Sequence, residues 1–270
     1  MLSYLLENKE VNGIRTVERF RKKFEDDPGT FMQVDRANKG ETETILFNID
    51  YEGSINKDKT AVLRVFAKVF YNHLGFFGSN LKVAMLEQYI TQQGKMDEFC
   101  RLIEEKKGKP WTEVRKAFAF NGKFIKPALA EALDISEEDA NNWFNDKSAT
   151  ELSVSQLVED INAYVSTKPA NFRLLFMVDE AGQYVGTDTD MLLNLQSLVE
   201  KIGSECRGKV WVVCTGQEAI DEIIKVRADE FSRIQARFKT RLSLSSSSVD
   251  EVIQKLSLIH ISEPTRPISI

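Results

Sequence analysis

The sequence predicts an α/β fold built on a parallel β-sheet. Three apolar runs, at 44–49, 173–180 and 209–216, alternate with segments whose apolar residues recur at helical spacing. A strand buried on both faces forms a near-continuous apolar run, and strand–helix–strand order with short links is typical of a parallel, doubly wound sheet. The long segment between the first two runs contains no convincing strand. It predicts an all-helical insertion in the α/β core.

The composition is that of a globular protein with a full hydrophobic core. The 270 residues are 42% hydrophobic and 29% charged, and the net charge of −5 indicates no general polyanion-binding surface. No apolar run approaches the roughly 18 residues of a membrane span, and no signal-peptide pattern is present. The three cysteines have no metal-ligand spacing and fit small buried thiols. We therefore expect a cytoplasmic protein without membrane contact.

Helical periodicity marks the elements around the first strand. Residues 1–6 read as the tail of an amphipathic helix, and residues 15–24 also have a helical pattern. After the strand at 44–49, apolar residues from 62 to 70 predict a helix with one buried face. His73 lies on that face, where we expect a satisfied core or edge histidine rather than a metal ligand.

Four parts are predicted along the chain. Ser136 and Ser153 have capping-box spacing, which predicts two helix starts within the insertion. Later in the chain a helix is predicted up to Ile202 with Gly203 as its C-terminal stop, and a further helix and strand at 220–238 and 241–245. The parts are a partial core (1–80), the helical insertion (81–165), the remaining core (166–256) and a tail (257–270).

The strand that ends in Asp179 and Glu180 has the form of a Walker B motif. Ligands of open α/β sheets bind at the carboxyl ends of the strands, so both acids would emerge where a nucleotide lies. Asp179 would then order Mg²⁺, directly or through water, and Glu180 would polarise the attacking water. The pattern alone fits equally well a strand whose terminal acids cap the next turn.

Two later segments favour the nucleotide interpretation. Thr215 and Gln217 follow the next strand, at the place of the sensor residue that contacts the γ-phosphate or the attacking water in AAA+ proteins. Arg237, with Arg233 and Arg241 as competitors, lies in a segment similar to the arginine-finger segment of AAA+ modules. The three features occur in the order that these ATPases have.

The phosphate-binding loop is missing. The sequence contains no G-x-x-x-x-G-K-[ST] motif. The nearest match, at 121–124, has Ala117 in place of the first glycine and Phe124 in place of the hydroxyl residue, and it lies between predicted helices. Without this loop the phosphates lose their backbone cradle and their lysine. We therefore expect the chain alone to bind ATP poorly or not at all.

Several segments together resemble the BrxC family of P-loop ATPases from BREX phage-defence systems. They are FNIDYEG, NNWF, LLFMVDEAGQYVG, MLLNLQSLVEKIG, KVWVVCTGQE and RFKTRLSLSSSSVDEVI, and the resemblance runs from about residue 1 to 256. It implies an AAA+-like P-loop NTPase core that lacks its first strand and Walker A loop and carries an all-helical insertion. Family members place the Walker A loop just before the helix that begins here at Met1, so we expect an inactive fragment.

The same resemblance implies the chemistry and partners of the full-length parent. They are ATP hydrolysis with Mg²⁺, association with other BREX proteins, and contact with DNA that is indirect. An arginine finger used in trans would also require a homo-oligomer. Residues 257–270 resemble translated sequencing-adapter read-through instead, so we expect a non-native tail in which His260 has no function.

Two other interpretations remain open. An ATP-independent interaction or scaffold module with a degenerate P-loop fold would explain the missing motif, although retention of Asp179, Glu180, Thr215 and Arg237 argues against it. A DExx-box helicase would read DEAH or DEAQ without a break, whereas Gly182 interrupts that box here.

Overall fold

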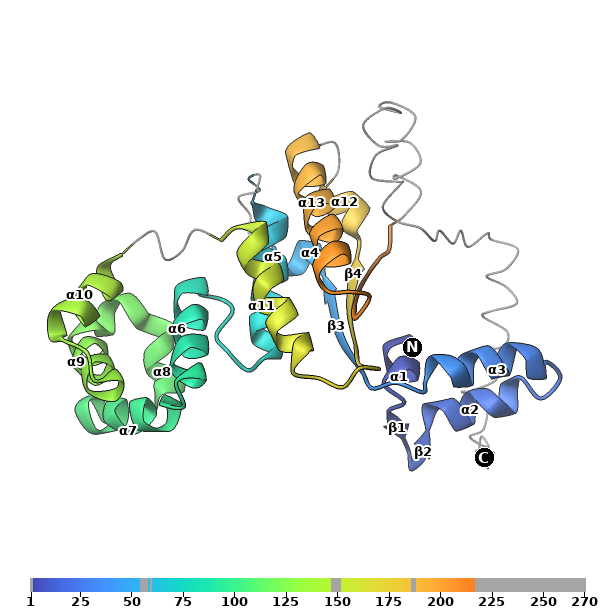
Figure 1. Ribbon diagram of the computed structural model, residues 1–270, viewed down its shortest axis with the longest axis horizontal. Coiled ribbons are helices and arrows are strands. Elements are labelled where there is room, and N and C mark those ends of the chain that lie inside the picture. The colour runs from blue at the N-terminus through green and yellow to red at the C-terminus, as the bar shows by residue number, and fades with distance from the viewer. Residues whose placement is uncertain (1, 54–57, 59, 147–151, 186–187, 217–270) are drawn as a thin grey trace, which may run out of the picture.

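The centre of the molecule is a three-stranded parallel sheet with the strand order β3-β4-β5 (Figure 1). The computed structural model describes residues 2–53, 58, 60–146, 152–185 and 188–216. The strands are β3 (Thr42–Asn48), β4 (Arg173–Asp179) and β5 (Val210–Cys214), and both neighbouring pairs are parallel. This confirms the predicted α/β fold with a parallel sheet. The predicted elements at 220–238 and 241–245 lie outside the described residues.

Three helices cover one face of this sheet. They are α5 (Ala61–His73), α11 (Val154–Ser166) and α13 (Thr189–Glu205). Both crossovers move in the same direction across the sheet, so a common right-handed sense places their helices on one face. The core includes Phe47, Phe66 and Phe176, whose rings lie 5.3–5.4 Å apart in neighbouring pairs. The apolar face predicted between 62 and 70 is therefore the one that packs on the sheet.

The N-terminal elements contact the first strand. Helix α1 (Leu2–Leu6) confirms the helical pattern at the start of the chain, and Glu7 just after it accepts a 2.8 Å hydrogen bond from the backbone N–H of Thr44. A short hairpin and two helices follow α1: β1 (Glu10–Val11), β2 (Ile14–Arg15), α2 (Thr16–Lys23) and α3 (Pro28–Ala37). Two single-turn helices follow the carboxyl ends of β3 and β4: α4 (Ile49–Glu52) and α12 (Ala181–Val185).

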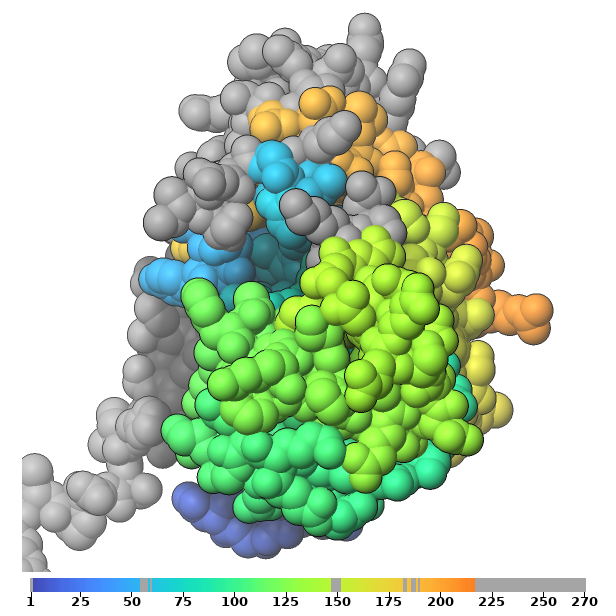
Figure 2. All heavy atoms as spheres, turned by 90° about the vertical axis from the view of Figure 1, so that its left-hand side faces the viewer, coloured from blue at the N-terminus to red at the C-terminus, as the bar shows by residue number. Residues whose placement is uncertain are grey.

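The helical insertion has a hydrophobic core of its own, separate from that of the sheet. Phe99 and Trp111 pack edge to face in it at 4.9 Å, and Glu87 is buried among them, accepting hydrogen bonds from Trp111 Nε1 and Arg115. This unit occupies the near side of Figure 2. Its helices are α6 (Leu81–Gln92), α7 (Met96–Lys107), α8 (Trp111–Val114), the 3₁₀ helix η1 (Arg115–Asn121), α9 (Gly122–Leu133) and α10 (Glu137–Asn145).

Two boundaries differ from those expected. The range 81–165 includes α11, yet Leu157 and Ile161 of this helix are buried in the sheet core rather than in the insertion. Helix α13 continues past Gly203 to Glu205, and the left-handed φ angles that follow it are those of Arg207 and Gly208. A glycine within a helix is tolerated when the flanking residues continue the hydrogen bonding. Both predicted caps are confirmed, because Ser136 and Ser153 accept from the backbone N–H groups three residues on.

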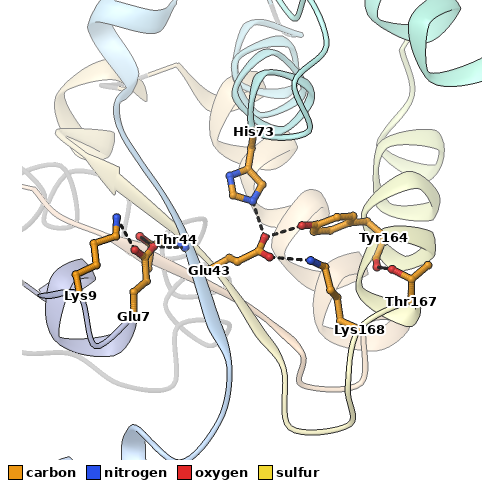
Figure 3. Close-up of polar contacts among 8 residues, drawn as sticks. All are labelled: Glu7, Lys9, Glu43, Thr44, His73, Tyr164, Thr167 and Lys168. Atoms are coloured by element: carbon orange, nitrogen blue, oxygen red, sulfur yellow. Dashed lines mark hydrogen bonds and ion pairs between the residues drawn. The ribbon is translucent and has the colours of Figure 1, made fainter. Parts of the chain in front are cut away.

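At the amino end of the sheet, Glu43 joins β3 to two of the covering helices (Figure 3). Its carboxylate contacts His73 Nε2 at 2.7 Å, the Tyr164 hydroxyl at 2.6 Å and Lys168 Nζ at 2.8 Å. Burial alone would raise the pKa of Glu43, but the hydrogen bonds from Lys168, Tyr164 and His73 outweigh it and lower the pKa to about 2. His73 is therefore an edge histidine in an ion-pair cluster, as expected.

Among the described helices, none has the length and apolarity needed to cross a membrane.

Candidate functional site at the carboxyl edge of the sheet

The two predicted acids lie at the carboxyl edge of the sheet, where all three strands end. The register pairs Asn48 of β3 with Asp179 of β4, and the backbone N–H of Thr215, just after β5, donates to Val178 O at 2.9 Å. Parallel strands in register bring the residues that follow them to one edge. The structure thus brings together Asp179, Glu180 and Thr215, three of the predicted site residues.

Thr215 binds both acids. Its hydroxyl donates a hydrogen bond to Asp179 Oδ1, and its Oγ1 accepts one from the backbone N–H of Glu180 at 3.3 Å. A hydroxyl can donate and accept at once, so one side chain fixes the positions of two neighbouring residues. Thr215 therefore connects the end of β5 to the end of β4, which is the position expected for it from the sequence.

Glu180 has an uncommon backbone conformation. Its φ is 59°, in the left-handed region that non-glycine residues seldom adopt. Such a conformation costs on the order of 1 kcal/mol or more and persists where surrounding contacts hold it. Here the contacts are the bond from Glu180 N–H to Thr215 and a 2.7 Å bond from Asn48 Nδ2 to Glu180 Oε2. The chain turns sharply after Asp179, and this turn points the Glu180 carboxylate back across the edge toward β3.

Asn48 is a site residue that the sequence analysis did not single out. Its Oδ1 accepts from the backbone N–H groups of Asp50 and Tyr51 at 3.0 and 3.2 Å, which caps α4. With Oδ1 occupied by two donors, the Nδ2 group faces Glu180. The sequence did contain a sign of this role, since Asn48 is a polar residue at the end of an apolar run. The sign becomes specific only once the strand order shows that β3 lies next to β4, which ends in the two acids.

The remaining predicted residues are not placed. Gln217 and Arg237, together with the competing Arg233 and Arg241, lie outside the described residues. A sensor role for Gln217 and an arginine-finger role for Arg237 stay predictions.

The edge can offer oxygen ligands to a cation. Asp179 is exposed, and Thr215 adds a hydroxyl beside it. Within the part of the chain that the structure describes, no group of three His, Cys, Asp or Glu side chains could hold a metal by itself. Mg²⁺ commonly takes one or two carboxylates and completes its shell with water and phosphate oxygens. The residues present fit that mode, but they do not fit a cage made of protein ligands alone.

Comparison with known proteins adds no family to these observations. No protein-family model matches this chain, and no solved structure matches it. The functional evidence therefore lies in the contacts among Asn48, Asp179, Glu180 and Thr215.

Proposed function

We propose that this chain is part of an ATPase of a BREX-type phage-defence system and carries the Walker B half of its nucleotide site. The observation that supports the proposal best is the placement of Asp179, Glu180, Thr215 and Asn48 at the carboxyl edge of a parallel sheet. This is the edge at which open α/β sheets bind their ligands. It is also the edge at which Mg²⁺ and a hydrolytic water would be needed.

Each residue has a separate task in this proposal. Mg²⁺, when bound with ATP, would neutralise the charge that develops on the phosphates. Asp179 would hold it directly or through water, and the Thr215 hydroxyl orients that carboxylate. Glu180 would orient and polarise the attacking water with Oε1, which has no partner among the described residues, while Oε2 is held by Asn48. In AAA+ proteins the sensor position also contacts the γ-phosphate, and we assign that contact to Thr215 and Gln217.

The phosphate cradle must come from elsewhere, because the chain has no G-x-x-x-x-G-K-[ST] motif. We propose that a longer parent supplies it, with ATP and Mg²⁺ as its cofactors, other BREX proteins as its partners and Arg237 acting between subunits of a homo-oligomer. The source DNA upstream of the Met1 codon should then encode this motif in frame. The 270-residue chain by itself should show no measurable ATPase activity.

The decisive experiment compares Glu180→Gln with the wild type in the full-length parent. Glutamine keeps the size of the side chain and can still accept from Asn48, but it loses the charge that polarises water. We expect Mg²⁺-dependent ATP hydrolysis to fall by roughly 10²-fold or more, with nucleotide affinity within a few-fold of wild type. Glu159→Gln, on α11, is the matched control and should leave turnover unchanged. Turnover at the wild-type rate in Glu180→Gln would exclude the Walker B assignment.

A second candidate function is an ATP-independent interaction module, which the missing Walker A motif favours. Titration of the parent with a fluorescent ATP analogue separates the two. Saturable, Mg²⁺-dependent binding that Asp179→Asn weakens supports the ATPase. An absence of binding in a parent that has the upstream motif would support the module.

A further inference from the structure

The helical insertion carries a basic and aromatic segment that the nucleotide site does not use. Residues 106–126 contain seven lysine or arginine residues and one glutamate, although the chain as a whole is acidic. The first three lysines follow Glu104 and Glu105 directly, so the sequence alone indicates no clear basic patch. The structure shows which of these charges are neutralised and which are not.

Three of the seven cations are paired with acids. Lys106 binds Glu131 and Lys109 binds Glu113, and Arg115 reaches the buried Glu87. The other four form no ion pair with any described residue: Lys107, Lys116, Lys123 and Lys126. Of the two neighbouring glutamates, Glu105 is paired with Arg101, and Glu104 is exposed. The segment therefore has an excess of positive charge that its own acids do not cancel.

Two of the lysines without an ion pair lie over the same aromatic ring, that of Phe124. Lys107 Nζ, at the end of α7, lies 4.5 Å from the centroid of Phe124, and Lys123 Nζ lies 4.8 Å from the same centroid. Phe120 lies three residues before Lys123 and four before Phe124, and it is 90% exposed, the largest exposed fraction among the large hydrophobic residues of the described chain. The exposed Phe120, near the end of η1, is thus followed in the first turn of α9 by a second ring that has two ammonium groups over it.

The position of Phe120 is fixed by buried neighbours on both sides. Phe118 is buried and stacks on Phe144 at 4.8 Å. The Asn121 side chain is also buried and donates to the carbonyls of Val114 and Ala117 at 3.1 and 3.0 Å. With both flanking residues anchored, the backbone holds Phe120 outward. The ring cannot turn inward without breaking these contacts.

We propose that this surface, Phe120 and Phe124 with Lys107 and Lys123, binds single-stranded nucleic acid. Exposed aromatic rings stack on unpaired bases, and neighbouring lysines contact the phosphates on either side. A protein partner would require a wider apolar area, but the other large exposed hydrophobic residues of the unit are Tyr89 and Ile135, at 52% and 38% exposure. One exposed ring with unneutralised cations fits a base and its phosphates better. The proposal is independent of the ATPase proposal.

The test uses the whole 270-residue chain and a fluorescein-labelled oligonucleotide of roughly 20 thymidines, read by anisotropy. We expect saturable binding that weakens as salt rises from about 50 to 200 mM. Phe120→Ala should lower the affinity roughly tenfold, and Phe120→Leu should lower it nearly as much, because leucine keeps apolar area but cannot stack. Phe120→Trp should retain the affinity. At 90% exposure, none of these changes should disturb folding.

Matched controls separate stacking from general charge. Tyr89→Ala removes an exposed aromatic residue from the same unit and should bind like wild type. Lys107→Ala with Lys123→Ala should reduce both the affinity and the slope of its logarithm against log salt, by roughly 1.4 for two phosphate contacts. Failure to bind the oligonucleotide, or equal affinities for wild type and Phe120→Ala, would overturn the proposal. A higher affinity of the wild type for a poly-glutamate peptide than for the oligonucleotide would also overturn it, because the surface would then bind acidic proteins.

Discussion

Asn48 and Glu180 lie 132 positions apart in the chain, yet Asn48 Nδ2 donates a 2.7 Å hydrogen bond to Glu180 Oε2. The bond crosses from the end of β3 to the end of β4. It holds a side chain whose backbone is in the left-handed region, φ 59°. Asn48 also caps α4 through its other amide atom. One residue therefore fixes both a helix start and the orientation of the proposed water-polarising acid.

Asn48→Asp should separate these two roles. Aspartate is a good helix cap and keeps the hydrogen bonds to Asp50 and Tyr51, but it replaces the donor to Glu180 with a second carboxylate. We expect a loss of roughly 1–2 kcal/mol in the free energy of unfolding at neutral pH, because like charges would face each other. The loss should shrink as the pH falls and one carboxylate takes a proton. Urea denaturation of both proteins across pH measures it. A pH-independent difference would argue against the Asn48–Glu180 contact.

Glu43→Gln tests the ion-pair cluster at the opposite end of the sheet. The pKa of Glu43 is lowered from 4.5 to about 2, so its stabilising contribution is complete above about pH 5 and is lost as the pH falls toward 2. We expect the variant to be less stable than wild type by roughly 1–2 kcal/mol at pH 7, and the two to converge in acid. Glu98→Gln, in an exposed i,i+3 pair with Lys95, is the control and should leave the free energy of unfolding nearly unchanged.

Gly203→Ala tests where α13 ends. Gly203 lies inside the helix, and an added Cβ would meet no atom within 4 Å. Alanine should therefore stabilise the protein by roughly 0.5–1 kcal/mol through its higher helix propensity. If Gly203 were a helix stop with a left-handed backbone, the same change would destabilise the protein. Gly208→Ala is the contrasting variant, since its φ of 79° strains any side chain. Thermal denaturation of the two variants gives the signs directly.

Glu87→Gln tests the buried carboxylate of the helical insertion. Glu87 is 1% exposed and binds Arg115 at 2.9 Å and the indole N–H of Trp111 at 2.6 Å. Removing its charge leaves a half-buried arginine without an ion partner, which should cost roughly 2–4 kcal/mol. Hydrogen exchange should rise in α6 to α9 while the amides of β4 stay protected, because the two hydrophobic cores are separate.

Glu105→Gln is a suitable control for that variant. Glu105 and Arg101 also form a glutamate–arginine ion pair, but theirs is exposed. It should leave exchange in both units unchanged. Equal exchange in the sheet and the insertion of Glu87→Gln would mean that the two cores unfold as one unit.

The features that sequence could predict are those set by local pattern. The runs at 44–49, 173–180 and 209–216 predicted strands because buried strands need apolar side chains on both faces. Ser136 and Ser153 predicted helix starts because their hydroxyls reach backbone N–H groups only three residues away. The acids at the end of β4 were visible for the same reason, since they follow directly on an apolar run.

Tertiary structure alone decided which distant residues meet. The hydrogen bond between Asn48 and Glu180 depends on strand order and on a register that pairs Asn48 with Asp179, and no local pattern encodes either. The same holds for Glu43, whose partners come from α5 and from the end of α11, and for α11 itself, which packs on the sheet although its sequence continues the helical pattern of the insertion. Periodicity shows that a residue needs a neighbour. Only the packing of elements distant in the chain determines which neighbour it has.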